Sequence, residues 1–147
     1  MVSMIERLER YKFIFPGSPI AQQRPRLSKY GVFNPQSEIK KKHQCILSSQ
    51  IPLGVDLRPL QGSIKVEMGF YTKIPNSWSQ KRKESVLGIP DITRPDLDNY
   101  VKFYLDVMNQ IIYNDDSQVT LLLCKKNYSD KPRTVIEISK HEVSNGC

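Results

Sequence analysis

The segment RPDLDNYVKFYLDVMNQII, residues 94–112, predicts the central helix of the fold. Its apolar side chains recur every three or four positions and form one stripe of about four turns. The stripe consists of Leu97, Val101, Tyr104, Leu105, Met108, Ile111 and Ile112. Pro95 suits the first turn of such a helix, where no backbone N–H is needed. Polar residues occupy the other side, namely Asp98, Lys102, Asp106 and Asn109.

Strands are predicted on both sides of this helix, at residues 11–15, 63–71, 118–128 and 133–140. The second of them alternates, and its inward residues would be Ile64, Val66, Met68 and Phe70. A further helix is predicted over 36–49, with an apolar side of Ile39, Cys45 and Ile46 and an outward side of Lys40, Lys41 and Lys42. In a chain of 147 residues this pattern indicates the α/β class, with an α+β mixed sheet and packed helices in a single domain, residues 1–147.

Two segments connect these elements, and the one from Thr72 to Arg94 is long for a compact domain. Residues 17–35 are punctuated by Pro and Gly and are not expected to form a helix. The connection from Thr72 to Arg94 is predicted to hold a short helix, because Ser77 and Gln80 have the spacing of a capping box and Gly88 could end it. That helix would carry Lys81, Arg82 and Lys83.

The composition indicates a globular protein with a polyanionic partner. The net charge is +7, which favours nucleic acid or an anionic membrane surface. No apolar run approaches the roughly 20 residues needed to cross a bilayer, and MVSMIERLER lacks the apolar core of a signal peptide. The three cysteines have no C-x-x-C spacing, so Cys45, Cys124 and Cys147 are interpreted as reduced cytosolic thiols.

Carboxylates are the scarce charge here, yet Asp96 and Asp98 begin the central helix and Asp115 and Asp116 precede the following strand. We expect the strand–helix–strand crossover to bring both ends of the helix to one edge of the sheet. Carboxylates about 5 Å apart would repel by about 3 kcal/mol per pair at an effective dielectric of 20, so their convergence would require protonation, a basic partner or a bound cation. Oxygen ligands favour Mg²⁺ or Mn²⁺ over zinc.

Structural roles are the commoner explanation of such residues, because helix caps and turns are frequent and catalytic sites are rare. Asp96 could cap the helix, Asp98 could form a solvated pair with Lys102, and Asp115 with Asp116 could make a turn. Spacing alone leaves both interpretations open.

The segment RPDLDNYVKFYLDVMNQIIYNDDSQV, residues 94–119, resembles the signature of the RusA family of Holliday junction resolvases. PGSPIAQQRPR, YGVFNP, KIPNSWSQKRK and KPRTVIEI extend the resemblance more loosely to most of the chain. The resemblance implies metal-binding roles for Asp96, Asp98 and Asp116, and a catalytic role for Lys102. It implies a structural role for Asn99, and Asp106 and Asp115 stay outside the catalytic set.

Phosphodiester hydrolysis needs an activated water and stabilised charge, which a carboxylate-held metal and a nearby ammonium can supply. No Ser/His or Cys/His arrangement competes, because His43 and His141 are expected at the surface. Backbone-dominated DNA binding would use the cations of the predicted loops and short helix. These are Arg24, Arg26, Lys29, Lys81, Arg82, Lys83 and Arg133. For each of them a solvated surface role remains open, and Trp78 and Tyr30 could either stack on unpaired bases or pack.

The prediction is therefore a Mg²⁺-dependent, structure-selective endonuclease that resolves four-way DNA junctions by paired symmetric nicks in recombination and repair, as a homodimer with no membrane partner. The resemblance implies a bacterial or phage protein, acting in the cytoplasm at the nucleoid. Two alternatives remain: a non-catalytic branched-DNA-binding module of the same fold, and a nuclease for other branched DNA.

Overall fold

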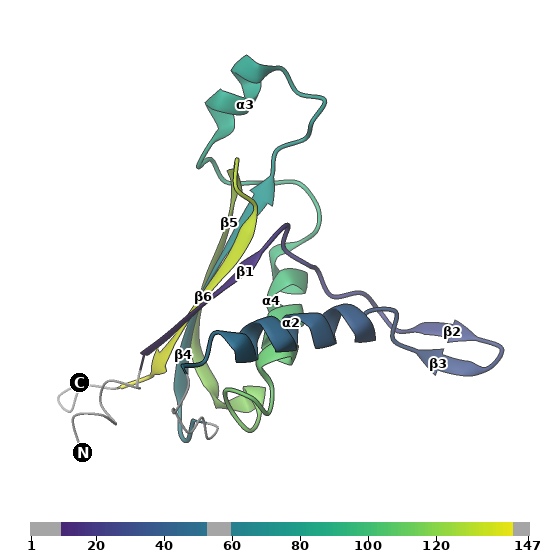
Figure 1. Cartoon of the computed structure of the whole chain (residues 1–147), viewed down its shortest axis with the longest axis vertical. Helices are drawn as coiled ribbons and strands as arrows, with labels where there is room; N and C mark the ends of the chain where they lie inside the picture. The colour runs from purple at the N-terminus through teal and green to yellow at the C-terminus, as the bar shows by residue number, and fades with distance from the viewer. Residues whose placement is uncertain (1–9, 53–59, 143–147) are drawn as a thin grey trace.

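A four-stranded mixed sheet forms the body of the molecule (Figure 1). The computed structural model describes residues 10–52 and 60–142. The strands lie in the order β1-β6-β4-β5, with bounds Arg10–Pro16, Arg133–Lys140, Ile64–Lys73 and Val119–Ser129. Strand β6 is antiparallel to both β1 and β4, whereas β4 and β5 are parallel. This small α+β domain confirms the predicted fold class.

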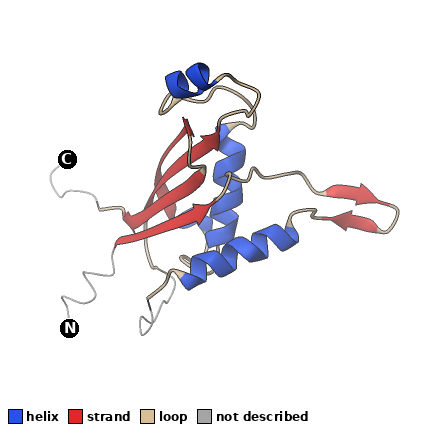
Figure 2. Ribbon diagram, turned by 45° about the horizontal axis from the view of Figure 1, so that its top comes forward, coloured by secondary structure: helices blue, strands red, loops and turns tan. Residues whose placement is uncertain are grey.

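Two helices cover one face of the sheet, and no described helix or strand covers the opposite face (Figure 2). They are α2 (Ser37–Ser49) and α4 (Leu97–Met108). A third helix, α3 (Gln80–Val86), stands beyond the ends of the strands (Figure 1). The inward side chains of β4 pack against α4, and the predicted alternation is confirmed by the burial of Ile64, Val66, Met68 and Phe70. No helix in the described ranges is long and apolar enough to span a membrane.

Helix α4 is shorter at both ends than the predicted segment, residues 94–112. Asp96 is its N-cap, so Pro95 precedes the helix and does not lie in the first turn. The helix ends because Asn109 is extended and Gln110 has a φ of 66°. Ile112 is nevertheless fully buried, since the turn after Met108 folds back onto the core.

The interior side of α2 differs from the prediction. His43 is buried, where a surface position was expected, and its ring packs against Phe15, Phe103 and Tyr104. Its Nδ1 lies 2.9 Å from the carbonyl oxygen of Ile39. Cys45, expected on the apolar side, is exposed. Lys40 is not free on the surface, because its Nζ lies 3.4 Å from the Asp106 carboxylate.

The connections hold two further differences. The N-cap of α3 is Ser79, whose hydroxyl accepts from the N–H of Arg82 at 3.2 Å, so the capping box expected at Ser77 is wrong. Gly88 follows the helix with a φ of +76°, as a terminating glycine should. Residues 17–35 contain a hairpin that was not predicted, β2 (Arg26–Ser28) and β3 (Gly31–Phe33), which projects away from the body (Figure 2). Cys45 and Cys124 are free thiols, and Cys147 lies outside the described residues.

Candidate active site and DNA-binding surface

Three of the candidate catalytic residues lie at the N-terminal end of α4. Asp96 is the N-cap, Asp98 is in the first turn and Lys102 is one turn further, and all three side chains are exposed. Asp96 makes no side-chain capping hydrogen bond, and the described residues include no ion pair between Asp98 and Lys102. The oxygens of Asp96 and Asp98 are therefore available to a ligand. The structural interpretation would instead have them bonded, in a side-chain cap for Asp96 and an ion pair with Lys102 for Asp98.

The loop that leads into this end is fixed by a buried carboxylate that the sequence analysis missed. Asp91 is only 6% exposed and accepts hydrogen bonds from the Thr72 hydroxyl at 2.7 Å and from the N–H of Thr93 at 2.8 Å. Burial raises the pKa of Asp91, but hydrogen bonds from Thr93 and Thr72 outweigh that effect and leave the pKa below its ordinary value. An Asp bonded to the N–H two residues on is an Asx-turn. The Pro-Asp-x-Thr pattern at 90–93 is the signal that could have revealed it.

Lys126 holds the same loop from the sheet and was also missed. Its ammonium donates to the carbonyl oxygens of Thr93 and Pro95. Since Lys126 lies near the C-terminal end of β5, these bonds attach the entrance of α4 to that end of the strand.

The fourth candidate, Asp116, lies in a short 3-10 turn at the other end of α4, Asp116–Gln118. Asp115 caps this turn in a capping box with Gln118, so Asp115 has the structural role of the alternative interpretation. The Gln118 side chain also donates to the carbonyl oxygen of Leu60 at 2.8 Å and accepts from the N–H of Asn114 at 2.9 Å. The Gln of the D-D-x-Q-V segment therefore anchors the acidic turn beside the start of β4.

Charge is concentrated around Asp116. A hydrogen bond with Asp115, partial burial, and repulsion by Asp115 and Asp106 raise the pKa of Asp116. The pKa of Asp115 is lowered, because the Ser117 hydroxyl donates to its carboxylate at 2.7 Å. Burial and the same three carboxylates raise the pKa of Tyr113. Asp116 therefore keeps its proton to a higher pH than Asp115 does.

The two ends of α4 do not converge, and the expected meeting of Asp96, Asp98 and Asp116 at one edge is wrong within a single chain. In a parallel crossover the helix begins where the first strand ends and returns to where the second strand begins. Helix α4 has 12 residues and spans about 18 Å. The part of the chain that the structure describes accordingly contains no group of three His, Cys, Asp or Glu side chains placed to hold a metal ion.

The candidate DNA-binding cations fall into three places. Arg24, Arg26 and Lys29 are exposed on and beside the β2–β3 hairpin. On α3, Lys81 and Arg82 are exposed and Lys83 is half-buried. Arg133 begins β6, as the predicted strand does, but it is not a free loop cation, because it is half-buried and lies 3.9 Å from the centroid of the Tyr71 ring.

Trp78 has the packing role. Its ring lies 5.6 Å from the Tyr128 ring, and the Arg82 guanidinium stacks 3.5 Å above it. Tyr30, in contrast, is 87% exposed at the tip of the hairpin. Trp78 is therefore packed and Tyr30 is free to contact a partner, although the sequence left both roles open for each.

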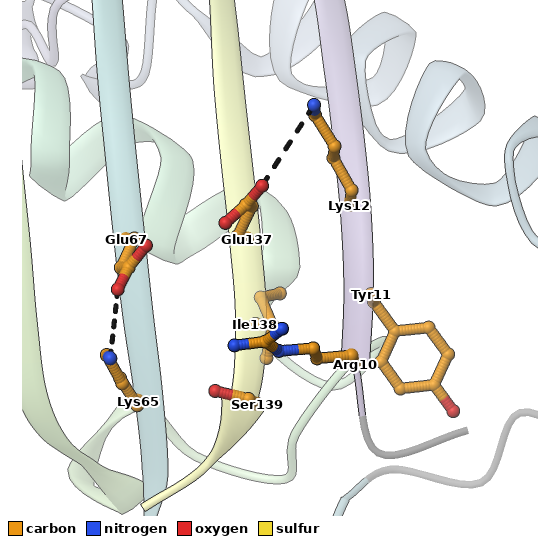
Figure 3. A pocket seen from close by; sticks show the side chains of 8 residues that line it. All are labelled: Arg10, Tyr11, Lys12, Lys65, Glu67, Glu137, Ile138 and Ser139. Carbon is orange, nitrogen blue, oxygen red and sulfur yellow. Dashed lines mark ion pairs between the residues drawn. The ribbon is translucent and has the colours of Figure 1, made fainter. Parts of the chain in front are cut away.

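A hollow of about 120 Å³ lies on the open face of the sheet (Figure 3). Its carboxylates are paired, with Glu67 2.9 Å from Lys65 and Glu137 4.0 Å from Lys12. Lys65 lowers the pKa of Glu67 by a hydrogen bond and by its charge. Both carboxylates lie beside ammonium groups, and neither belongs to the predicted catalytic set, so the hollow is not the candidate catalytic site.

Comparison with known proteins identifies the family of this chain. The family model described as "Endodeoxyribonuclease RusA" matches residues 16–139. The chain belongs to the RusA endodeoxyribonuclease family, which implies a DNA endonuclease, and nucleases of this family generally depend on a divalent metal ion. The chain is also 37% identical over 139 residues to "Uncharacterized protein YqaN" of Bacillus subtilis (strain 168), covering 90% of this chain and 96% of that protein.

Proposed function

We propose that this chain is a Mg²⁺-dependent endonuclease that recognises branched DNA and resolves four-way junctions by paired symmetric nicks, in bacterial or phage recombination and repair. The observation that carries the proposal is the pair of exposed, uncommitted carboxylates at the first turn of α4, Asp96 and Asp98, with Lys102 one turn further. Carboxylates without a structural partner in a member of this family are candidates for catalysis.

The donor set is suited to a hard divalent cation. Asp96, Asp98 and Asp116 would hold Mg²⁺, or Mn²⁺, through carboxylate oxygens, the ligands that these ions prefer. When bound, the ion would activate a water and neutralise the phosphate. The Lys102 ammonium would stabilise the charge that develops on the leaving oxygen.

A homodimer would reunite the separated carboxylates. A two-fold axis perpendicular to α4 reverses the direction of the partner's helix, so the N-terminal end of one α4 faces the C-terminal end of the other. In an isologous interface each such contact occurs twice. One dimer would therefore have two sites, each with Asp96 and Asp98 from one chain and Asp116 from its partner. Two nicks related by the same two-fold symmetry are what resolution of a four-way junction requires.

The exposed cations supply binding to the phosphate backbone, which dominates affinity for DNA. Arg24 and Arg26 lie at the base of the β2–β3 hairpin and Lys29 lies at its tip, and the segment before them is bonded to the N-terminal turn of α4 through Gln22 and Asn99. Lys81, Arg82 and Lys83 lie on α3, beyond the same end of the sheet, and Arg133 lies at the start of β6. The α3 cations and Arg133 therefore lie toward the end of the sheet near Asp96 and Asp98, and the hairpin carries the other three cations outward.

A cleavage assay tests the proposal. The protein is incubated with synthetic four-way junctions, flaps and linear duplex, with and without Mg²⁺. We expect symmetric nicks in the junction only when Mg²⁺ is present. Binding without cleavage would instead indicate a non-catalytic DNA-binding module, and equal cleavage of flaps would indicate a nuclease for other branched DNA.

A further inference from the structure

The β2–β3 hairpin exposes apolar side chains that no other described residue covers. Every residue of both strands is exposed, and the hairpin projects away from the sheet and helices (Figures 1 and 2). Leu27 is 84% exposed, Tyr30 87% and Val32 67%. Isolated apolar residues are ordinary on a surface, but a cluster on a projecting element indicates an interaction site. We call residues 24–33 the arm.

The arm is a preformed ribbon with a defined tip. Leu27 pairs with Val32 across the two strands, so their side chains lie on the same face of the ribbon. At the tip the Ser28 hydroxyl accepts from the N–H of Tyr30 at 3.2 Å and donates to the carbonyl oxygen of Gly31 at 3.1 Å. Gly31 has a φ of +121°, which favours glycine. The turn therefore presents Tyr30 outward, with the Lys29 ammonium 5.1 Å from its ring centroid.

The base of the arm is attached to the candidate catalytic end of α4. The buried Gln36 side chain accepts from the N–H of Gln23 and donates to the carbonyl oxygen of Ala21, both at 2.7 Å. The N–H of Gln22 donates to the carbonyl oxygen of Asn99 at 2.8 Å. Since Asn99 directly follows Asp98, the arm extends outward from the same turn that carries the carboxylates.

The charge of the arm favours nucleic acid as the partner. Between Gly17 and Ser37 there is no Asp or Glu, whereas Arg24, Arg26 and Lys29 are exposed. A symmetric contact between the arms of two copies would place these cations against one another, which is unfavourable. A two-stranded ribbon fits a DNA groove, and apolar side chains on such elements insert between base steps and unstack them.

We propose that the arm is the element that distinguishes branched from linear DNA. Tyr30, Leu27 and Val32 contact the bases at the branch point, where stacking is already interrupted, and the three cations contact the flanking phosphates. This inference rests on the proposed function, because it deepens how the same enzyme selects its substrate.

The test is a triple variant, Leu27→Ser, Tyr30→Ser and Val32→Ser, compared with Leu123→Ser, a half-exposed leucine on the open face of the sheet. Binding to a four-way junction and to linear duplex is measured without divalent metal, and 2-aminopurine at the branch point reports unstacking. We expect the parental protein and the Leu123→Ser control to prefer the junction and to raise the fluorescence. The triple variant should lose about tenfold in junction affinity, with duplex affinity unchanged and no rise in fluorescence.

Three results would overturn the proposal. One is a triple variant that keeps both its junction preference and the fluorescence rise; another is parental protein that shows neither. The third is a triple variant that sediments at half the parental mass, which would make the arm an interface between copies. Failure of the parental protein to cleave with Mg²⁺ would count against the proposed function alone, because these binding measurements need no cleavage.

Discussion

Asp98 and Asp116 lie at opposite ends of α4, and the parallel pairing of β4 and β5 keeps them apart. The sheet shows the same separation between the two residues. Lys126, which is bonded to Thr93 and Pro95 at the N-terminal end of α4, lies seven residues along β5 from Val119. Seven residues of a strand span about 23 Å. A single chain therefore offers two incomplete acidic sites, and the proposed chemistry requires a second copy.

The first prediction concerns assembly. Because each proposed site takes carboxylates from two chains, sedimentation at micromolar concentration should give about twice the chain mass of 17.0 kDa. A species that remains monomeric both free and on junction DNA would contradict the proposed dimer.

The second prediction concerns the carboxylates, through Asp98→Asn and Asp116→Asn made separately. Each change keeps the size of the side chain and removes one negative charge. We expect normal folding and loss of most cleavage, equivalent to several kcal/mol of transition-state stabilisation. Junction affinity without metal should hold or rise, because less negative charge faces the phosphates.

The control for this pair is Asp130→Asn, which removes an equally exposed charge in the turn between β5 and β6. It should cleave at the parental rate. If Asp98→Asn and Asp116→Asn lower the melting temperature but keep cleavage per folded molecule, both residues have structural roles and the catalytic assignment is wrong.

The third prediction concerns α3. Changing Lys81 and Lys83 to Ala leaves the stacking of Arg82 on Trp78 intact. If both lysines contact phosphates, the slope of log affinity against log salt should become shallower by about 0.9 for each lost contact. The measurement is junction binding across a salt series, and an unchanged slope would assign these lysines to the solvated surface.

The fourth prediction concerns Asp91. Asp91→Ala leaves the hydroxyl of Thr72 and the N–H of Thr93 without their acceptor, so it should cost about 1–3 kcal/mol of unfolding free energy at pH 7. Because folding lowers the pKa of Asp91, the stabilisation is fully present above its unfolded pKa of about 3.9 and is lost as pH falls through the folded value. Denaturant unfolding should show that the difference in unfolding free energy between variant and parent becomes smaller in acid. A difference that is independent of pH would contradict this account.

Periodicity predicted the elements well because it follows burial. The alternation of β4 and the stripe of α4 match the observed core. His43 could have been predicted as buried, since it lies four residues after Ile39 and four before Leu47 on one side of α2. His43 was instead predicted at the surface because it follows Lys40, Lys41 and Lys42.

Spacing could not give the direction of the crossover. The positions of Asp98 and Asp116 in the sequence are compatible with the same end or with opposite ends of the sheet. Only the parallel pairing of β4 with β5 places them at opposite ends. The hairpin was missed because three-residue strands have no measurable alternation. Asp91 was missed because its importance comes from Thr72, which is distant in sequence.

Subunit complementation tests the central claim most directly. Asp98→Asn and Asp116→Asn chains are co-expressed with different tags, and the heterodimer is purified. If sites form between chains, one site combines both substitutions and the other is intact, so the heterodimer should nick junctions at about half the parental rate. A matched heterodimer of Asp98→Asn with Asp96→Asn has both sites damaged and should be inactive. A heterodimer of Asp98→Asn with Asp116→Asn that is as inactive as either homodimer, while the parental enzyme nicks, would contradict the account.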